Sequence, residues 1–501
     1  MFVLIIREYR KCSIWISLLH TSYVPEMWWR CSNVLTSANF KHAVKRFAST
    51  AVEIKPRSTS VLVPPDTNFS RLSNGVRIAT ENHGGSLCTI GLWLDVGSRY
   101  ERPQEHGASH VLEHLFFQGT AQRNKDKLAS DIGKSTYLVD AYTSREHMAV
   151  YAVCFTKDVD EVFKLLSEIV TRPSFSNEAV ENARGEVLSQ LQNAEDDPRA
   201  IVSHYLHSQA YMGTPLSAPP TGRYSVVQNL SATDLKTFHQ NNFQGHRIVV
   251  VGAGDVDHRR LHDLAQTHLG NISNEYVDEI PELAVCRYTG SFVYHREDSW
   301  PYCYGIVAAE APGWDDVDKH LSMLIAARIF GNWDAAVEPY ESSPFRLPQR
   351  LGVHRHLRLY DSLYFPYLKT GLWGTYFVLE PSKTEQFGSD LMREWKYLHS
   401  LSNDRDVELG KNFLKSEILK SSESSVGAAD SIGKDILRYN RRLSVPYLIE
   451  KIDKLSSNQV KHTIFEYLDD CDPVIIGFGQ CAHLEFDHYW TMKWKTTWWF
   501  Q

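Results

Sequence analysis

Apolar and polar residues alternate along this chain with two different periods, which predict both strands and helices. Residues 149–155 (AVYAVCF) form a short apolar run that is typical of a buried β-strand. From Val159 to Ile169, apolar side chains recur every three to four positions, which places them on one face of a helix. We therefore expect strands and amphipathic helices to share a domain.

The order of these elements is repeated in the second half of the chain. An apolar strand that ends in a turn occupies residues 91–101, and a similar stretch occupies residues 305–315. A β-branched strand that runs into glycines occupies residues 247–254, and its counterpart occupies residues 473–479. Landmarks at similar spacing indicate an internal duplication of about 200 residues per unit. We predict an α+β fold of two homologous domains, each with a mixed, mainly antiparallel sheet and helices packed on one side.

The length of 501 residues exceeds what one hydrophobic core accommodates, and the landmarks divide the chain into three parts. We assign residues 60–280 to the first domain and residues 286–501 to the second. Residues 1–52 precede them as an extended N-terminus. From Met27 to Val52 this segment holds basic residues but no Asp or Glu, which is typical of a mitochondrial transit peptide. The alternative is a disordered tail without a targeting role.

Composition changes this picture in three respects. The net charge of −7 argues against a general nucleic-acid binder. The eight cysteines are scattered and form no C-x-x-C motif, so we expect reduced, packed thiols. No apolar run reaches the roughly 18 residues that span a bilayer, so we expect a soluble or membrane-peripheral chain.

Residues 110–114 (HVLEH) carry the candidate chemistry. Histidines four positions apart lie one above the other on a helix, so the imidazoles of His110 and His114 can reach one zinc ion. Glu113 lies close enough to take a proton from water as the catalytic base, and the order is that of the inverted zinc proteases, H-x-x-E-H. The alternative is a helix with two half-buried histidines that are only hydrogen-bonded. The corresponding stretch of the second half begins at His320 and lacks the motif.

Several longer runs carry a resemblance that extends far beyond the metal motif. They are GSRYE (97–101), HVLEHLFFQG (110–119), DAYTSRE (140–146), HYLH (204–207), APGW (311–314) and ILRYNRR (436–442). With these runs the chain resembles the pitrilysin-type inverted zincins of peptidase family M16, from about residue 61 onward. Within that family it is similar to the β subunit of the mitochondrial processing peptidase and to core protein 1 of the cytochrome bc1 complex, respiratory complex III.

The resemblance implies roles for individual residues. His110 and His114 match the two zinc histidines of the family, and Glu113 matches the base that activates water. The family's third ligand is a glutamate, which aligns with Gln190, and a neutral amide carbonyl is a weak zinc ligand. Glu186 lies one turn earlier on the same helical face and is the candidate substitute, although it would have to bridge an axial displacement of roughly 6 Å. Zinc binding is therefore expected to be weak or absent.

Two further positions depart from the family pattern. The acids with which the family binds the arginine of a presequence align with Ala200 and His204, so recognition of basic peptides is expected to be weakened. The residues that bind a substrate in this chain stay unknown.

Two functions follow from the resemblance. The leading hypothesis is a core 1-like structural subunit of complex III with weak or no peptidase activity, because three separated functional positions have changed. The alternative is a zinc endopeptidase, the β subunit of a mitochondrial processing peptidase, that removes basic presequences. A tissue-restricted duplicate with a partner of its own is a third hypothesis. The expected partners are a homologous α-type or core 2 subunit and the other complex III subunits, without nucleic acid. The expected location is the matrix side of the mitochondrial inner membrane, peripheral to the bilayer.

Overall fold

The computed structural model describes residues 66–278, 280, 283–351, 356–381, 384–481 and 484. The expected transit peptide at residues 1–52 lies outside the described residues, as do Cys12 and Cys31. The other six cysteines are free thiols, as expected. Among the described helices, none has the length and apolar character that a membrane crossing requires.

The first half of the chain forms a six-stranded sheet in the order β1-β2-β6-β3-β5-β4. Its strands are β1 (Thr67–Arg71), β2 (Arg77–Glu81), β3 (Leu87–Leu94), β4 (Leu138–Thr143), β5 (Met148–Phe155) and β6 (Ile248–Ala253). The β2–β6 pair is parallel, and all other neighbours are antiparallel. The apolar run at 149–155 is therefore a strand, as its pattern predicts.

The second half repeats most of this topology, in the order β7-β12-β8-β11-β10-β9. Its strands are β7 (Ser291–Arg296), β8 (Cys303–Ala311), β9 (Asn332–Asp334), β10 (Leu357–Pro366), β11 (Gly371–Leu379) and β12 (Val474–Gly479). Again only one pair, β7–β12 at the edge of the sheet, is parallel. The run β7-β12-β8-β11-β10 thus matches β2-β6-β3-β5-β4, while β1 and β9 are edge strands without a counterpart. Two sheets that share this five-strand order and its parallel pair confirm the predicted α+β class with two homologous units.

The helices of each half follow in matching order. In the first half they are α4 (Ala108–Leu115), α5 (Lys125–Lys134), α6 (Val159–Thr171), α7 (Asn177–Ala194), α8 (Pro198–Ala210), α9 (Tyr224–Val227), α10 (Ala232–Asn242) and α11 (His258–Leu269). In the second half they are α12 (Val317–Phe330), α13 (Arg346–Leu351), α14 (Thr384–Lys396), α15 (Asp404–Ser422), α16 (Ser425–Tyr439), α17 (Val445–Lys454) and α18 (Ser457–Leu468). Helices α6 and α11 pack on the first sheet, and α12 and α18 pack on the second.

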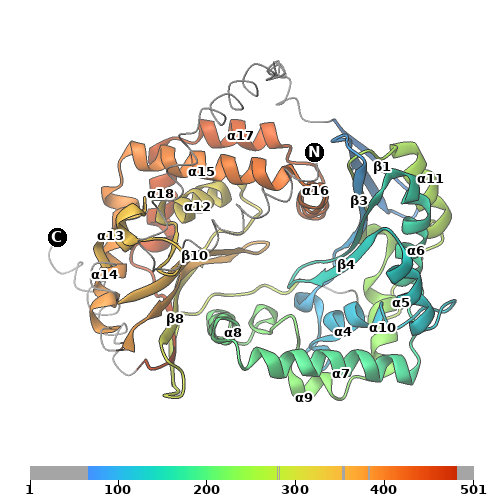
Figure 1. Cartoon of the computed structure of the whole chain (residues 1–501), viewed down its shortest axis with the longest axis horizontal. Helices are drawn as coiled ribbons and strands as arrows, with labels where there is room; N and C mark the ends of the chain where they lie inside the picture. Colours follow the sequence, from blue (N-terminus) through green and yellow to red (C-terminus); the bar gives the residue numbers. More distant parts are fainter. Residues whose placement is uncertain are drawn as a thin grey trace, which may run out of the picture. The chain divides into compact units, whose positions relative to one another are not determined.

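The other face of each sheet receives one helix from the opposite half (Figure 1). Helix α16 packs on β3 and β6 of the first sheet, while α8 packs on β8 and β12 of the second. Trp93, Val249 and Val251 form the face under α16, where they meet Ala429 and Ile432. Because β3 and β6 are apolar on both faces, each needs cover on both sides. The exchange of α8 and α16 binds the two halves into one compact unit.

Gly433 marks a close approach of α16 to the first sheet. A Cβ at this position would lie 2.3 Å from Cγ of Trp93. Alanine normally stabilises a helix relative to glycine, but here we expect Gly433→Ala to lower the free energy of unfolding by about 1–3 kcal/mol through overpacking. Gly185 in the interior of α7 has no neighbour within 4 Å, so Gly185→Ala should raise stability by about 0.5–1 kcal/mol. Urea denaturation measures both, and stabilisation by both substitutions would contradict this packing of α16.

A buried charge cluster also joins the C-terminal end of α16 to β2. The Arg442 guanidinium donates to Glu81 Oε1 at 2.7 Å and to Asp435 Oδ2 at 2.5 Å. Burial raises the pKa of Glu81, but His83, Arg442 and Thr67 outweigh it through hydrogen bonds and hold the pKa at about 2. Burial raises the pKa of Asp435 to about 6, although Arg442 opposes the rise.

This cluster predicts a loss of stability in acid. The folded-state pKa of Glu81 lies below its ordinary value of 4.5, so its contribution is present above pH 4.5 and is lost as the pH falls toward 2. A shift of this size corresponds to about 3 kcal/mol. The difference in unfolding free energy between the unaltered chain and Glu81→Gln should therefore shrink between pH 5 and pH 3. The Asp435 effect has the opposite sign and is common to both proteins. A difference that stays constant with pH would contradict the prediction.

Candidate metal centre

The metal motif lies on α4, which packs against α7 (Figure 1). The chain enters α4 through Gly107, whose φ of 100° is left-handed and favours glycine. The carboxylate of Glu101 accepts hydrogen bonds from the backbone N–H groups of Gly107 and Ser109, both at 2.8 Å. Because the first N–H groups of a helix have no partner within it, Glu101 fixes the start of the metal helix. The sequence showed Glu101 only as part of a longer run, without a role.

The structure brings His110, Glu113 and His114 together. Their ligand atoms lie within 4.8 Å of one another, and no other such group of three occurs in the part of the chain that the structure describes. Nδ1 of His110 lies 3.2 Å from Oε2 of Glu113. Nε2 of His114 is buried without a hydrogen-bond partner. A buried imidazole nitrogen without a partner is what a metal ligand would present.

Helix α7 brings the two remaining candidates to the same place. Oε1 of Gln190 lies 2.8 Å from Nε2 of His110, so Gln190 faces the motif from the neighbouring helix. Oε2 of Glu186 lies 3.0 Å from Nδ1 of His114, and Oε1 of Glu186 accepts a hydrogen bond from Gln118 at 2.8 Å. Glu186 thus contacts Nδ1 of His114 and leaves Nε2 of the same ring free. This is the arrangement of an outer carboxylate that orients a ligand histidine, rather than that of a substitute ligand.

These contacts show how far the site fits zinc. Two imidazoles and Gln190 converge, but Gln190 offers a neutral oxygen where zinc sites commonly use a carboxylate or thiolate. Gln118, which lies beyond the end of α4, was not singled out from the sequence. Its partner stands 68 residues away in the chain, so no local pattern identifies it.

Electrostatics in the site favour a proton on His110. Burial lowers the pKa of His110, but the neighbouring Glu113 carboxylate and the Gln190 carbonyl raise it, and the net shift is upward. Burial raises the pKa of Glu101 to about 7, although hydrogen bonds from Ser109 and Gly107 oppose it. Because a protonated imidazole cannot bind a metal, zinc binding would compete with protonation of His110.

The two positions aligned with presequence-binding acids lie on α8. Ala200 is half-buried and His204 is exposed. Although His204 reaches solvent, partial desolvation by the groups packed around its ring lowers its pKa, and the guanidiniums of Arg145 and Arg223 lower it further. The charges near His204 are therefore positive.

The equivalent helices of the second half, α12 and α15, hold no metal-binding group. Glu417 and Gln190 occupy equivalent positions on their helices. Each lies the same number of residues after the N-cap of its helix, which is residue 403 for α15 and residue 176 for α7. Glu417 forms an ion pair with Arg328 of α12 at 2.6 Å. His320 of α12 is hydrogen-bonded to the Tyr364 hydroxyl at 3.0 Å. The Glu417 carboxylate is thus bound to a guanidinium of the protein.

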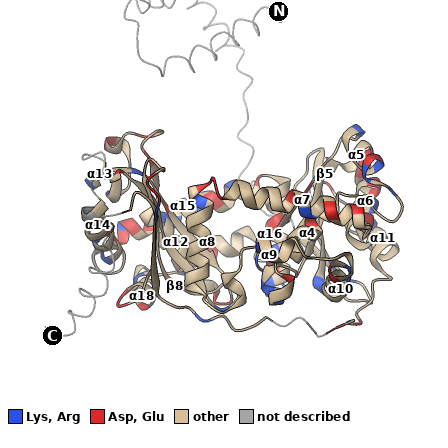
Figure 2. Cartoon of the chain, turned by 90° about the horizontal axis from the view of Figure 1, so that it is seen from below, with Lys and Arg blue, Asp and Glu red and all other residues tan. Residues whose placement is uncertain are grey.

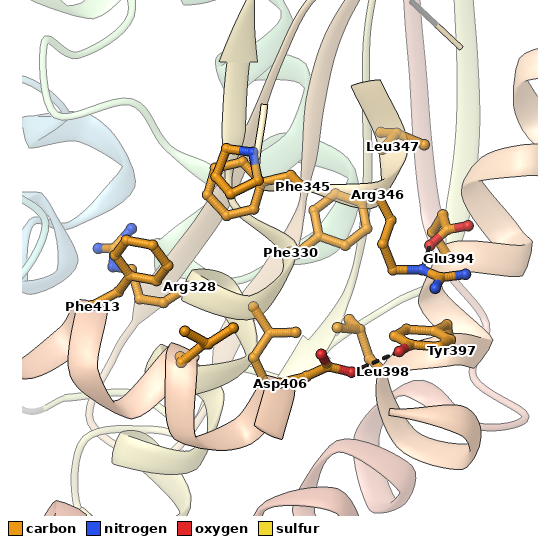
Figure 3. Close-up of a pocket in the computed structure, with 14 residues that line it drawn as sticks. Arg328, Phe330, Phe345, Arg346, Leu347, Glu394, Tyr397, Leu398, Asp406 and Phe413 are labelled. Atoms are coloured by element: carbon orange, nitrogen blue, oxygen red, sulfur yellow. Dashed lines mark hydrogen bonds and ion pairs between the residues drawn. The ribbon is translucent and has the colours of Figure 1, made fainter. Parts of the chain in front are cut away.

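A pocket of about 130 Å³ lies beside this ion pair (Figure 3). Its acids are already bound: Glu394 accepts from Arg346, and Asp406 accepts from the Tyr397 hydroxyl. Figure 3 shows the Arg346 side chain between Glu394 and Tyr397. The Arg346 guanidinium carbon lies 3.6 Å from the centre of the Tyr397 ring. With its charges satisfied internally, this pocket is a less suitable metal site than the α4–α7 contact.

Comparison with known proteins covers both halves of the chain. The family model described as Insulinase (Peptidase family M16) matches residues 77–222, and that of the Peptidase M16 inactive domain matches residues 229–414. The chain is 33% identical over 425 residues to the mitochondrial-processing peptidase subunit beta of Bos taurus. This alignment covers 85% of the chain and 86% of that protein. It is 32% identical over 423 residues to the mitochondrial cytochrome b-c1 complex subunit 1 of Homo sapiens, which covers 84% and 88%.

A solved structure shares the fold. A chain of complex III2 from Candida albicans, with Inz-5 bound, matches with a TM-score of 0.76 at 23% identity. The match covers 85% of this chain and 99% of that one.

Proposed function

Because this chain belongs to peptidase family M16, we propose that it is a core 1-like subunit of mitochondrial respiratory complex III that has kept the peptidase fold and lost most of its chemistry. One observation carries the proposal: Gln190 stands at the third-ligand position, with its neutral carbonyl 2.8 Å from His110. Sequence identity alone does not separate the two roles, since relatives of both kinds are similar to nearly the same degree. The residues of the site are therefore what supports the proposal.

Zinc bound at this site would supply a Lewis acid that activates water for peptide hydrolysis. His110 and His114 would hold the ion, and Glu113 would take up a proton. Gln190 would add an oxygen without a charge, so the ligand set would leave the charge of the ion uncompensated. Weak zinc binding and slow or absent hydrolysis follow from this loss.

The expected partners and location follow from the relatives. Both named relatives are mitochondrial proteins, which supports a mitochondrial location for this chain. As a core subunit it would lie on the matrix side of the inner membrane, peripheral to the bilayer, paired with a core 2 or α-type subunit and with the other complex III subunits.

The second candidate function is the β subunit of a mitochondrial processing peptidase, which would cut basic presequences. The retained cluster of His110, Glu113 and His114, with its free Nε2, favours this alternative. It requires Gln190, or another group, to complete the zinc site.

Assembly of complex III tests the proposal. Cells that lack the chain should contain less assembled complex III, and the unaltered chain and Glu113→Gln should restore it equally, because no proteolysis is needed. Native gels and ubiquinol–cytochrome c reductase activity measure the result. Normal complex III in cells without the chain, or failure of Glu113→Gln alone to rescue, would overturn the structural role.

A further inference from the structure

Segments far apart in the sequence meet beside the start of the metal helix. Gly222 packs against Gly107, because a Cβ on Gly222 would lie 2.5 Å from Cα of Gly107. The backbone carbonyl of Arg145 accepts the N–H of Arg99 at 2.8 Å, which holds the β4–β5 turn against the segment that leads to α4. The segment at 215–217 contacts both residues 98–100 and α8, so α8 belongs to the same region.

The Tyr367 side chain connects this region to α8 through hydrogen bonds. The Tyr367 hydroxyl lies 2.8 Å from Nε2 of His207 on α8, and the Arg145 side chain also hydrogen-bonds Tyr367. His204 stands one turn earlier on the same helix. Partial desolvation is the main cause that lowers the pKa of His204, and Arg145 and Arg223 lower it further. Burial lowers the pKa of His106, and Arg223 adds to this shift. Both guanidiniums therefore lie within electrostatic reach of His204, and that of Arg223 also lies within reach of His106.

The two arginines have no counter-charge within the described residues. No carboxylate of that part of the chain lies within 4.0 Å of either guanidinium. Nε of Arg145 is buried without a hydrogen-bond partner, whereas Arg223 is exposed. Figure 2 shows basic residues (blue) at the segment around α9, which Arg223 precedes. In a chain of net charge −7, two arginines without a carboxylate partner form a local site of positive charge.

We propose that this basic patch (Arg145 and Arg223, beside His204) binds an acidic peptide segment, where an active relative would take a basic one. A carboxylate side chain would give the arginines the charge-assisted hydrogen bonds that they lack within the chain. Arg223 follows Gly222, which packs against Gly107 at the start of α4, so a peptide on the patch lies next to the metal helix. The inference does not depend on the role in complex III, because binding requires neither assembly nor proteolysis.

The competing ligand is a basic peptide, and one feature of the chain favours it. Glu195, Asp196 and Asp197 are exposed just before α8. They stand at least seven residues before His204, which is roughly 10 Å along a helix. Asp197 is also the N-cap of α8, where it accepts the N–H of Arg199 at 2.9 Å. The test therefore compares both charges of peptide.

Fluorescence anisotropy of labelled 12-residue peptides on the full chain, purified with its partner, distinguishes the ligands. The acidic peptide should bind more tightly than a basic peptide of matched length, with an affinity that falls as salt rises. Arg223→Glu should weaken the acidic peptide by about tenfold or more and strengthen the basic one. Arg259→Glu, an exposed arginine on α11, is the charge-matched control and should change neither.

Three results would overturn the inference: tighter binding of the basic peptide, binding of neither peptide, or equal effects of Arg223→Glu and Arg259→Glu. Failure here leaves the complex III role untouched, because that role is tested by assembly. Failure of the assembly test, with binding of the acidic peptide intact, would overturn the proposed function alone.

Discussion

Gln190→Glu is expected to raise the affinity of the chain for zinc by at least about 100-fold. The amide oxygen of Gln190 already lies 2.8 Å from Nε2 of His110, so a carboxylate there would join the two imidazoles without a change of backbone. It would also add the negative charge that the ligand set lacks. Even outer residues of zinc sites change the affinity by roughly 10–100-fold, so a direct ligand should change it by at least that much.

The charge-matched control lies on the same helix. Gln192 is exposed and stands two residues further along α7, on a different face, so Gln192→Glu adds the same charge away from the motif. Competition with a chromophoric chelator and the zinc content of the purified protein give both affinities. Equal affinities for Gln190→Glu and Gln192→Glu would mean that position 190 does not reach the metal.

Glu146→Ala is expected to lower the free energy of unfolding by about 3–5 kcal/mol, because it breaks a buried ion pair and leaves one charge alone. Glu146 binds Arg99, whose side chain is only 4% exposed. Its carboxylate also accepts the indole N–H of Trp314 at 2.8 Å and the backbone N–H of Leu368 at 2.9 Å. Arg99 and Glu146 belong to the first half and the other two to the second. One carboxylate therefore holds the halves together beside the metal helix.

Two further variants identify the cause. Glu146→Gln keeps one acceptor oxygen but no charge, so its loss should be intermediate. Glu450 pairs with Lys454 on the exposed face of α17, and Glu450→Ala should leave the melting temperature unchanged. Urea and thermal unfolding measure the series. A Glu146→Ala protein as stable as Glu450→Ala would contradict the account of this contact.

Local pattern predicted the elements of this fold well. The periodicity at 159–170 corresponds to α6 (Val159–Thr171), and the apolar run at 149–155 corresponds to β5 (Met148–Phe155). The exchange of α8 and α16 between the sheets was not predicted. An apolar helix face shows that the helix is covered, but it does not show which of two similar sheets covers it. That choice depends on contacts such as Gly433 against Trp93, which are distant in the sequence.

Some residues of the candidate site could likewise be predicted from the sequence, and others could not. His110, Glu113 and His114 could be predicted from their spacing on one helix. Gln190 is 80 residues from His110, and only the family resemblance placed it there. Glu101, Gln118 and the partners of Arg145 could not be predicted, because their roles arise from tertiary contacts. The outward position of Glu186, on Nδ1 of His114, likewise required the structure.

The measurement that tests the central claim most directly is cleavage of a basic presequence peptide by the chain purified with its α-type partner, in the presence of zinc. The Glu113→Gln protein provides the blank, since it lacks the base while keeping the fold. Our account predicts that the unaltered chain cleaves no faster than Glu113→Gln. Rapid cleavage by the unaltered chain that Glu113→Gln abolishes would contradict the account and assign the chain to the active peptidases.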